Sequence, residues 1–306
     1  MTKTKKSASF IALDVFYIVM AILPLAAGLL LDILTTPRGG DGVDIAGARI
    51  YFELELFEGT RFFNIIISEA QVNSILVILT ILFVCLYLTH GVKEKIDLKR
   101  QHIAEIIVQK VDSLVGENMG QNFSGYAPFI IAIMALSGLS SLLSLLGLFP
   151  PTSDLNIVGG WAILVFILIT YYKLKCGPLY YLKGFTQPVF VLAPINFISE
   201  FATPVSMAFR HYGNVMSGAV ISVLISWFLE TLSNFIFGAI TLLPILQVGL
   251  PAILSLYFDI FSGCLQAFIF AMLTMLNIST AFDADEYNRR KLKKQQKKMN
   301  KLNGGN

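Results

Sequence analysis

Long apolar stretches are the feature that most restricts how this chain can fold. Six of them occupy residues 10–34, 71–90, 126–149, 157–172, 189–229 and 232–280. A run of about 18 or more apolar residues is typical of a membrane-spanning helix, and a segment inside lipid must satisfy its own backbone hydrogen bonds. The sequence therefore predicts an all-α integral membrane protein with about six membrane helices.

The last two stretches are too long to cross a bilayer at right angles. At 1.5 Å per residue, a helix over 189–229 would be roughly 60 Å long, about twice the hydrocarbon thickness. We therefore expect the last two helices to be long, tilted and partly in the membrane plane, with Glu230 at the turn between them. Four prolines are candidate bending points. They are Pro194 and Pro204 in the fifth stretch and Pro244 and Pro251 in the sixth.

The charged residues and cysteines exclude several other classes of protein. Only 14% of the 306 residues are charged, against roughly 25% in soluble domains. The net charge of +3 and the placement of lysine and arginine between apolar stretches give no support to nucleic-acid binding. The spacing of Cys85, Cys176 and Cys264 fits neither a zinc site nor a disulfide framework, and we expect no metal and no cofactor.

The positions of lysine and arginine predict the orientation, because cytoplasmic loops carry an excess of both. With both termini in the cytoplasm, 19 of these residues lie inside and three lie outside. The lysine-rich start of the first helix also resembles a signal peptide, but we expect this helix to be retained. The basic tail after residue 282 is expected to be a solvated helix or a disordered end, or to contact anionic lipid.

Arg210 stands out because it is the one basic residue deep within apolar sequence, and arginine stays charged there. An ionisable residue inside a membrane helix is a functional candidate by default. It belongs to a polar stripe at helical spacing on the fifth helix. That stripe comprises Ser206, Arg210, Asn214, Ser217 and Gly218. A second stripe, on the last helix, comprises Asp259, Ser262, Gly263 and Gln266.

Two interpretations of these stripes are open. In the first interpretation, Arg210 and Asp259 form a structural ion pair, and a buried ion pair is weak evidence for function. In the other, the stripes line an ion pathway, which the unusual helix lengths favour. A secondary transporter would show repeated halves, and an intramembrane enzyme a motif such as HExxH or GxSxG. The sequence contains neither feature.

Two runs resemble the a subunit of F-type ATP synthases. PINFISEFATPVSMAFRHYGNVMSG (194–218) is similar to its signature, an arginine preceded by a Pro-containing segment and followed by Gly-Asn. FDIFSGCLQAFIFAMLTMLNIS (258–279) resembles its final helix, and YAPFI (126–130), GLFPPTSDLN (147–156) and YLKGFTQPVFVLAPIN (181–196) fit its middle helices and loops. The resemblance covers roughly residues 50–280.

The chain departs from that pattern at three places. His211 and Tyr212 follow the arginine, where the family commonly has Leu-Phe or Leu-Tyr, and Ala219 stands where many members carry Glu or His. Asp259 lies on the other helix, and we interpret it as the protonatable group that Ala219 lacks. His211 points about 100° from Arg210, toward either lipid, a neighbouring helix or the channel.

The resemblance implies a non-catalytic stator subunit of a rotary ATP synthase in a bacterial inner, or plasma, membrane. Its partners would be the c-subunit ring, the b-subunit peripheral stalk and the rest of the complex. Arg210 would separate two half-channels, with proton expected before sodium as the ion. The residues of the ion pathway would be Asn214, Asp259, Gln266 and Asp154 on the outer side, Glu200 on the inner side, and Ser206 beside the arginine.

We expect three regions. Residues 1–50 would form an additional N-terminal membrane helix and an outer loop. Residues 51–282 would be the a-subunit membrane domain, and residues 283–306 a basic cytoplasmic tail.

Overall fold

The structure is a computed structural model that describes residues 8–35, 47–54, 65–92, 99–186, 189–237, 249, 253–254 and 256–303. Within these residues, six helices are long and apolar enough to cross a membrane. They are Ser9–Thr35, Glu69–Thr89, Asn122–Leu146, Leu155–Cys176, Phe190–Ile236 and Leu256–Ala281. The expectation of an all-α membrane protein with six membrane helices is confirmed.

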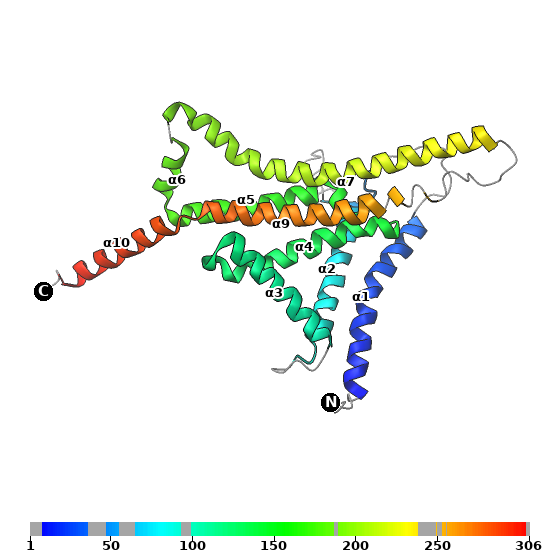
Figure 1. The fold of residues 1–306 in the computed structure, drawn as a ribbon, viewed down its shortest axis with the longest axis horizontal. Helices are drawn as coiled ribbons and strands as arrows, with labels where there is room; N and C mark the ends of the chain where they lie inside the picture. The colour runs from blue at the N-terminus through cyan, green and yellow to red at the C-terminus, as the bar shows by residue number, and fades with distance from the viewer. Residues whose placement is uncertain are drawn as a thin grey trace.

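Helices α1 (Ala8–Thr35) and α2 (Glu69–Thr89) lie side by side and are steeply inclined to the rest of the bundle (Figure 1). A short antiparallel hairpin precedes α2, a small departure from an all-helical fold. It pairs β1 (Ile50–Leu54) with β2 (Ile65–Ser68). Arg49 joins the upper ends of the two helices, because it pairs with Asp32 of α1 and, at 3.1 Å, with Glu69 of α2.

A second ionic cluster joins the opposite ends of these helices to α3 (Lys99–Met119). Asp14 of α1 pairs with Arg100 of α3 and lies 3.0 Å from His90, which follows α2. The Phe10 ring stacks on the His90 ring at a centroid distance of 4.5 Å. The first helix is therefore anchored at both ends and packs as part of the fold.

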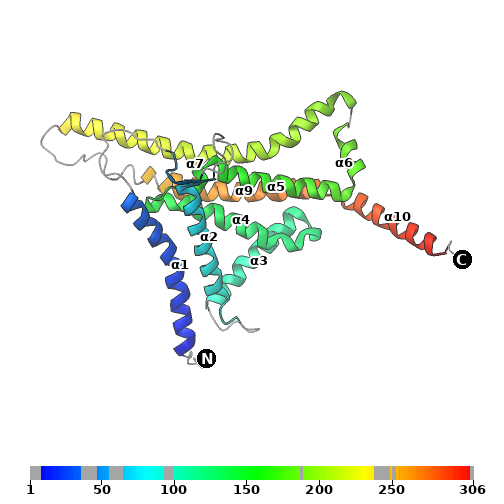
Figure 2. The same cartoon turned by 180° about the vertical axis from the view of Figure 1, so that it is seen from behind.

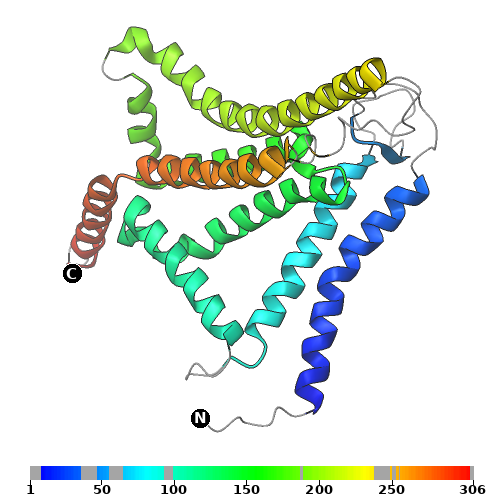
Figure 3. The same cartoon turned by 45° about the vertical axis from the view of Figure 1, so that its right-hand side comes forward.

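The remaining membrane helices form a layered bundle (Figures 1 and 3). Its members are α4 (Ala127–Leu142), α5 (Leu155–Cys176), α7 (Ala193–Phe237) and α9 (Gly263–Ala281). α4 packs on α9, and α5 packs on both α7 and α9. The centre of the bundle is apolar and includes Ile130, Val165, Phe270 and Met275, all fully or almost fully buried. This packing fixes which faces of α7 and α9 meet.

Short helices connect or extend these members. The 3₁₀ helices η2 (Gln121–Tyr126) and η3 (Leu143–Leu146) flank α4, and η4 (Pro151–Ser153) precedes α5. Beyond α5, the chain reaches α7 through α6 (Pro178–Phe185) and η5 (Phe190–Leu192). The basic tail forms α10 (Ala284–Asn303), which projects away from the bundle (Figure 2).

The lengths of the last two helices differ from the expectation. α7 has 45 residues, about 68 Å of helix, and Pro204 lies within its visibly curved course (Figure 1). Glu230 is inside α7 and exposed, so its expected place in a turn is wrong. The last span, formed by the π-helical η8 (Leu256–Ser262) and α9, has 26 residues. Within the described residues this span is of ordinary length, because residues 232–237, expected in the sixth stretch, continue α7.

The other candidate bending points were Pro194, Pro244 and Pro251. Pro194 lies in the first turn of α7, where proline fits without breaking a backbone hydrogen bond. It is therefore not a bend within the helix. Pro244 and Pro251 lie outside the described residues.

The close contact between α9 and α4 depends on Gly263. A Cβ atom at this position would lie 2.8 Å from the Cβ of Ser141, so Gly263→Ala is expected to destabilise the chain by about 1–3 kcal/mol, as overpacking does. The matched control is Gly160→Ala, whose added methyl group meets no atom within 4 Å. The measurement is the heating temperature at which each variant is lost from the assembled complex. Equal temperatures for both variants would contradict this packing.

Candidate functional site

The two predicted polar stripes face each other. Asn214 of α7 and Ser262 of η8 exchange side-chain hydrogen bonds of 2.8 and 3.0 Å. One turn further along α7, a Cβ atom on Gly218 would lie 3.2 Å from the Phe258 ring. This small residue therefore permits the close approach of the two helices. The two stripes thus meet at Asn214 and Gly218 of α7, whereas Ser206 and Arg210 lie on the exposed face of that helix.

Gln266 continues this contact into the bundle. It lies one turn beyond Ser262 and one turn before Phe270 on the same face of the last helix, and only 4% of its surface is exposed. The Phe270 ring lies 5.6 Å from the ring of His211, which neighbours Arg210. Gln266 therefore lies between the level of Asn214 and that of Arg210 and His211.

Arg210 points away from the bundle. It is exposed on α7, as are Ser206 and Phe209, whereas Met207 and Ala208 on the other side of the helix are buried. Among the residues that the structure describes, Arg210 has neither an ion pair nor a hydrogen bond with Asp259 or any other side chain. The interpretation of Arg210 and Asp259 as a structural ion pair therefore receives no support.

Asp259 and Asp154 occupy different surroundings. Asp259, on η8, is half-buried, and η8 packs against η3, which carries Ser144. Asp154 caps the N-terminus of α5, where its carboxylate accepts a 2.8 Å hydrogen bond from the Asn156 backbone. N-capping is a structural task in itself, and within the described residues the Asp154 carboxylate forms no hydrogen bond or ion pair with η8.

His211 is a buried residue whose surroundings the sequence left open. Its side chain is 0% exposed and contacts three helices of the bundle. Its Nε2 atom lies 3.3 Å from the Ser137 hydroxyl of α4, and its ring lies 6.1 Å from Trp161 of α5 and 5.6 Å from Phe270 of α9. Orientation toward lipid is therefore excluded.

Hydroxyl groups on α4 and its neighbours are functional candidates that sequence reasoning missed. They are Ser137, Ser141, Ser144 and Thr152, of which all but Ser144 are buried. Ser141 lies 3.3 Å from Thr152. The sequence does contain a pattern that indicates this cluster, because serines at positions 137, 141 and 144 share one helix face.

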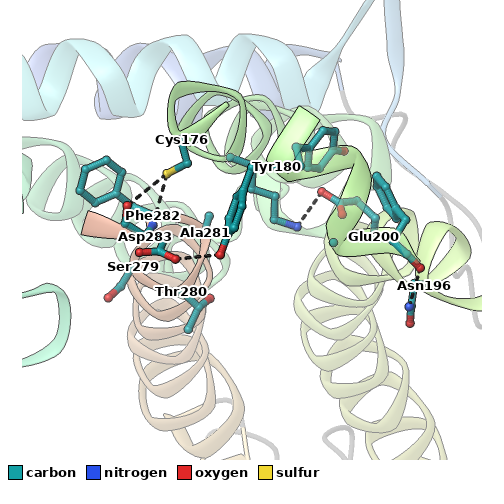
Figure 4. A pocket seen from close by; sticks show the side chains of 13 residues that line it. Cys176, Tyr180, Asn196, Glu200, Ser279, Thr280, Ala281, Phe282 and Asp283 are labelled. Carbon is teal, nitrogen blue, oxygen red and sulfur yellow. Dashed lines mark hydrogen bonds and ion pairs between the residues drawn. The ribbon is translucent and has the colours of Figure 1, made fainter. Parts of the chain in front are cut away.

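Glu200 lines a cavity of about 510 Å³ between the end of α5, α6, the start of α7 and the end of α9 (Figure 4). Its side chain is almost buried and forms a 2.8 Å ion pair with Lys173 of α5. Tyr181 also lines the cavity, and burial together with the negative charge of Glu200 raises its pKa to about 12. Glu200 thus lies in a polar opening, ten residues before Arg210.

Asp283 lines the other side of this cavity and caps the N-terminus of α10. The backbone N–H of Glu286 and the Tyr180 hydroxyl donate hydrogen bonds that lower the pKa of Asp283. The Asp283 backbone also contacts the Cys176 sulfur (Figure 4). The junction of α9 and α10 is therefore tied to the end of α5. Within the described part of the chain, no cluster of three or more His, Cys, Asp or Glu residues is placed to hold a metal ion.

Comparison with known proteins gives a consistent result. The family model for the ATP synthase A chain matches residues 72–279. The chain is 32% identical to the ATP synthase subunit a of Desulforamulus reducens over 62% of this chain and 70% of the relative. It is 29% identical to the ATP synthase subunit a of Geobacter sulfurreducens over 71% of this chain and 90% of the relative. It is 36% identical to the sodium ion specific ATP synthase subunit a of Propionigenium modestum over 45% of this chain and 42% of the relative.

Proposed function

The chain belongs to the ATP synthase A chain family, and from this premise we propose that it gives ions two separate routes to a rotating c ring, with Arg210 between them. Family membership and the six apolar helices make it a multi-pass membrane subunit of an ATP synthase. The proposal adds the routes, the role of Arg210 and the c ring and b-subunit stalk as its neighbours.

The outward position of Arg210 carries this proposal. A permanent charge facing lipid is costly, and charged residues in membrane helices are normally paired or face water. Arg210 has no such partner among the described residues of its own chain, and it lies on an exposed face of α7. An acidic group on another chain would meet the requirement. A carboxylate of the c ring would be drawn to Arg210, which favours its ionised form.

Polar groups approach Arg210 from both directions along α7. In one direction lies the Glu200 cavity, about 15 Å away along the helix. In the other lie Asp259 and the contact between Asn214 and Ser262. We assign the first to the inner half-channel and the second to the outer. Arg210 would block direct passage from one to the other, because its fixed charge repels a cation.

The transported ion is proposed to be a proton. A protonated carboxyl is neutral and can pass through lipid, whereas an ionised one cannot without a large penalty. One relative that matches part of the chain is named sodium ion specific. Sodium is therefore the alternative that an ion-flux measurement has to separate from protons.

The position of the chain in the membrane is also a proposal. If α1 and α2 cross the bilayer near its normal, then α7, which is steeply inclined to them (Figure 3), lies partly in the membrane plane. The excess of lysine and arginine would place α10 and the Glu200 cavity on the cytoplasmic side, and the start of α5 outside.

Cysteine labelling tests this orientation. In a background without Cys85, Cys176 and Cys264, an impermeant maleimide should label Asn156→Cys in intact cells. The same reagent should label Asn300→Cys only after the cells are permeabilised. Labelling in the reverse order would contradict the orientation.

Cross-linking tests whether the exposed face of α7 meets the ring. Ser206→Cys and Ser217→Cys lie on the exposed face that carries Arg210, and Met207→Cys lies on the buried face as the control. Each is combined with one cysteine beside the buried carboxylate of the co-purified c subunit. Disulfides are expected with positions 206 and 217 but not with 207. Cross-links from 207 alone, or from none of the three, would contradict the proposal.

A further inference from the structure

A line of hydroxyl groups runs inside the chain from Asp259 to His211. At one end, Ser144 lies on η3, which packs against η8, the helix that carries Asp259. At the other, the Ser137 hydroxyl lies 3.3 Å from His211 Nε2. Ser141 lies between them and contacts Thr152 of η4 at 3.3 Å. We call Ser137, Ser141, Ser144 and Thr152 the hydroxyl seam. It follows one face of α4 and η3, directly against α9 and η8.

Several buried polar atoms along this seam have no protein partner. They are the Ser140 and Ser153 hydroxyls and His211 Nδ1, within the described residues. Buried polar groups almost always have a hydrogen-bond partner, from protein or from water. Three unpartnered atoms beside one line of hydroxyls therefore point to internal water. Side chains three or four residues apart on a helix are about 5–6 Å apart, a gap that one water molecule bridges.

His211 is suited to carry a proton at the end of this seam. An imidazole accepts a proton on one ring nitrogen and releases one from the other. The rings of Trp161 and Phe270 lie 6.1 and 5.6 Å from the His211 ring in edge-to-face contacts, which hold the imidazole in place. Arg210 is adjacent in sequence, and no recorded contact joins another charged side chain of the described residues to the imidazole.

We propose that the hydroxyl seam is a hydrated proton path and that His211 takes up and releases the proton beside Arg210. A proton leaves the Asp259 carboxyl, passes through water and the hydroxyls, and binds to Nε2 of His211. A second proton leaves Nδ1 toward the ring carboxylate, so that the imidazole is neutral again after each passage. This inference rests on the proposed function and names the residues and the ion of its outer route.

The first test measures water access to the seam. In the cysteine-free background, Ser141→Cys in membranes containing the whole complex is exposed to Ag⁺, and the chain is then unfolded and alkylated. Ag⁺ should protect Cys at 141 from alkylation. The control is Ile130→Cys, a fully buried position in the apolar core on the same helix, which should stay unprotected. Equal protection at the two positions would overturn the hydrated path.

The second test removes the proton carrier. Gln keeps a hydrogen-bonding group near Ser137 but cannot become charged. His211→Gln is therefore expected to slow ATP-driven proton pumping about tenfold, a modest share of what a positioned proton-transfer group contributes. Assembly and the Ag⁺ protection at position 141 should be unchanged. Pumping within twofold of the unmodified complex would overturn the role of His211.

A comparison with Arg210→Ala separates this inference from the proposed function. If Arg210→Ala abolishes coupled transport and His211→Gln does not slow it, only the path through His211 fails. If Arg210→Ala has no effect, the proposed function itself fails.

Discussion

Replacing Arg210 by alanine is expected to stop ATP synthesis and to make the membrane leak protons. Without the fixed cation, an arriving ring carboxylate has no opposite charge to hold it in its ionised form. An uncompensated charge within a membrane helix costs about 2.5–3.5 kcal/mol, which corresponds to a rate decrease of roughly 100-fold. The leak arises because the two routes are then no longer separated by a repelling charge.

Two further variants sharpen this prediction. Arg210→Lys keeps a positive charge but loses the planar guanidinium and its permanent protonation, so it should also abolish coupled transport. Arg289→Ala is the control, because Arg289 lies on α10 in an exposed pair with Glu286, where ion pairs contribute little. ATP synthesis and passive proton flux are measured in vesicles that contain each variant complex. A normal rate of synthesis in Arg210→Ala would contradict the prediction.

Replacing Asp259 by asparagine is expected to lower proton flux by about 100-fold, the lower end of what a positioned proton-transfer group contributes. Asn has a similar size but cannot take up or release a proton. Asp259 is half-buried and directly follows Phe258, which contacts Gly218 of α7. Within the described residues, this acid therefore adjoins the contact between the two polar stripes.

The double variant Asp259→Asn with Ala219→Glu should recover part of this flux. Ala219 is exposed on α7 and directly follows Gly218, which contacts Phe258, so a carboxyl group fits there one residue from the contact between the stripes. Glu230→Gln is the control, since this exposed acid lies three turns further along α7. Normal pumping by the single Asp259→Asn variant would show that the outer route has been placed wrongly.

The sequence predicted the number of membrane helices and two polar stripes, each on one helix face, but not the contact between Asn214 and Ser262. Both follow from strong periodic signals, because apolar length defines a span and helical spacing defines a face. The contact of Asn214 with Ser262 depends on how α7 packs against η8, which the spacing on one helix does not define. The end of α7 was not predicted, because the polar run ETLSN (230–234) is typical of a turn, whereas here it continues the helix to Phe237.

The parts of the site that depend on tertiary packing could not be predicted from the sequence. Glu200 was predicted, but not its pairing with Lys173 across the cavity, because the turn through α6 brings the two helices together. His211 was ambiguous for the same reason. Its direction relative to Arg210 follows from the helix, whereas the helices that bury it do not.

ATP synthesis by the double variant Arg210→Ala/Asp259→Ala tests the central claim most directly. If Arg210 and Asp259 were a structural ion pair, removing both charges would be nearly harmless, because such replacements are often neutral or stabilising. If Arg210 acts on a ring carboxylate, no change at Asp259 replaces it. We predict that vesicles containing the double variant make no ATP. Coupled ATP synthesis in these vesicles would contradict the account and assign Arg210 a structural role.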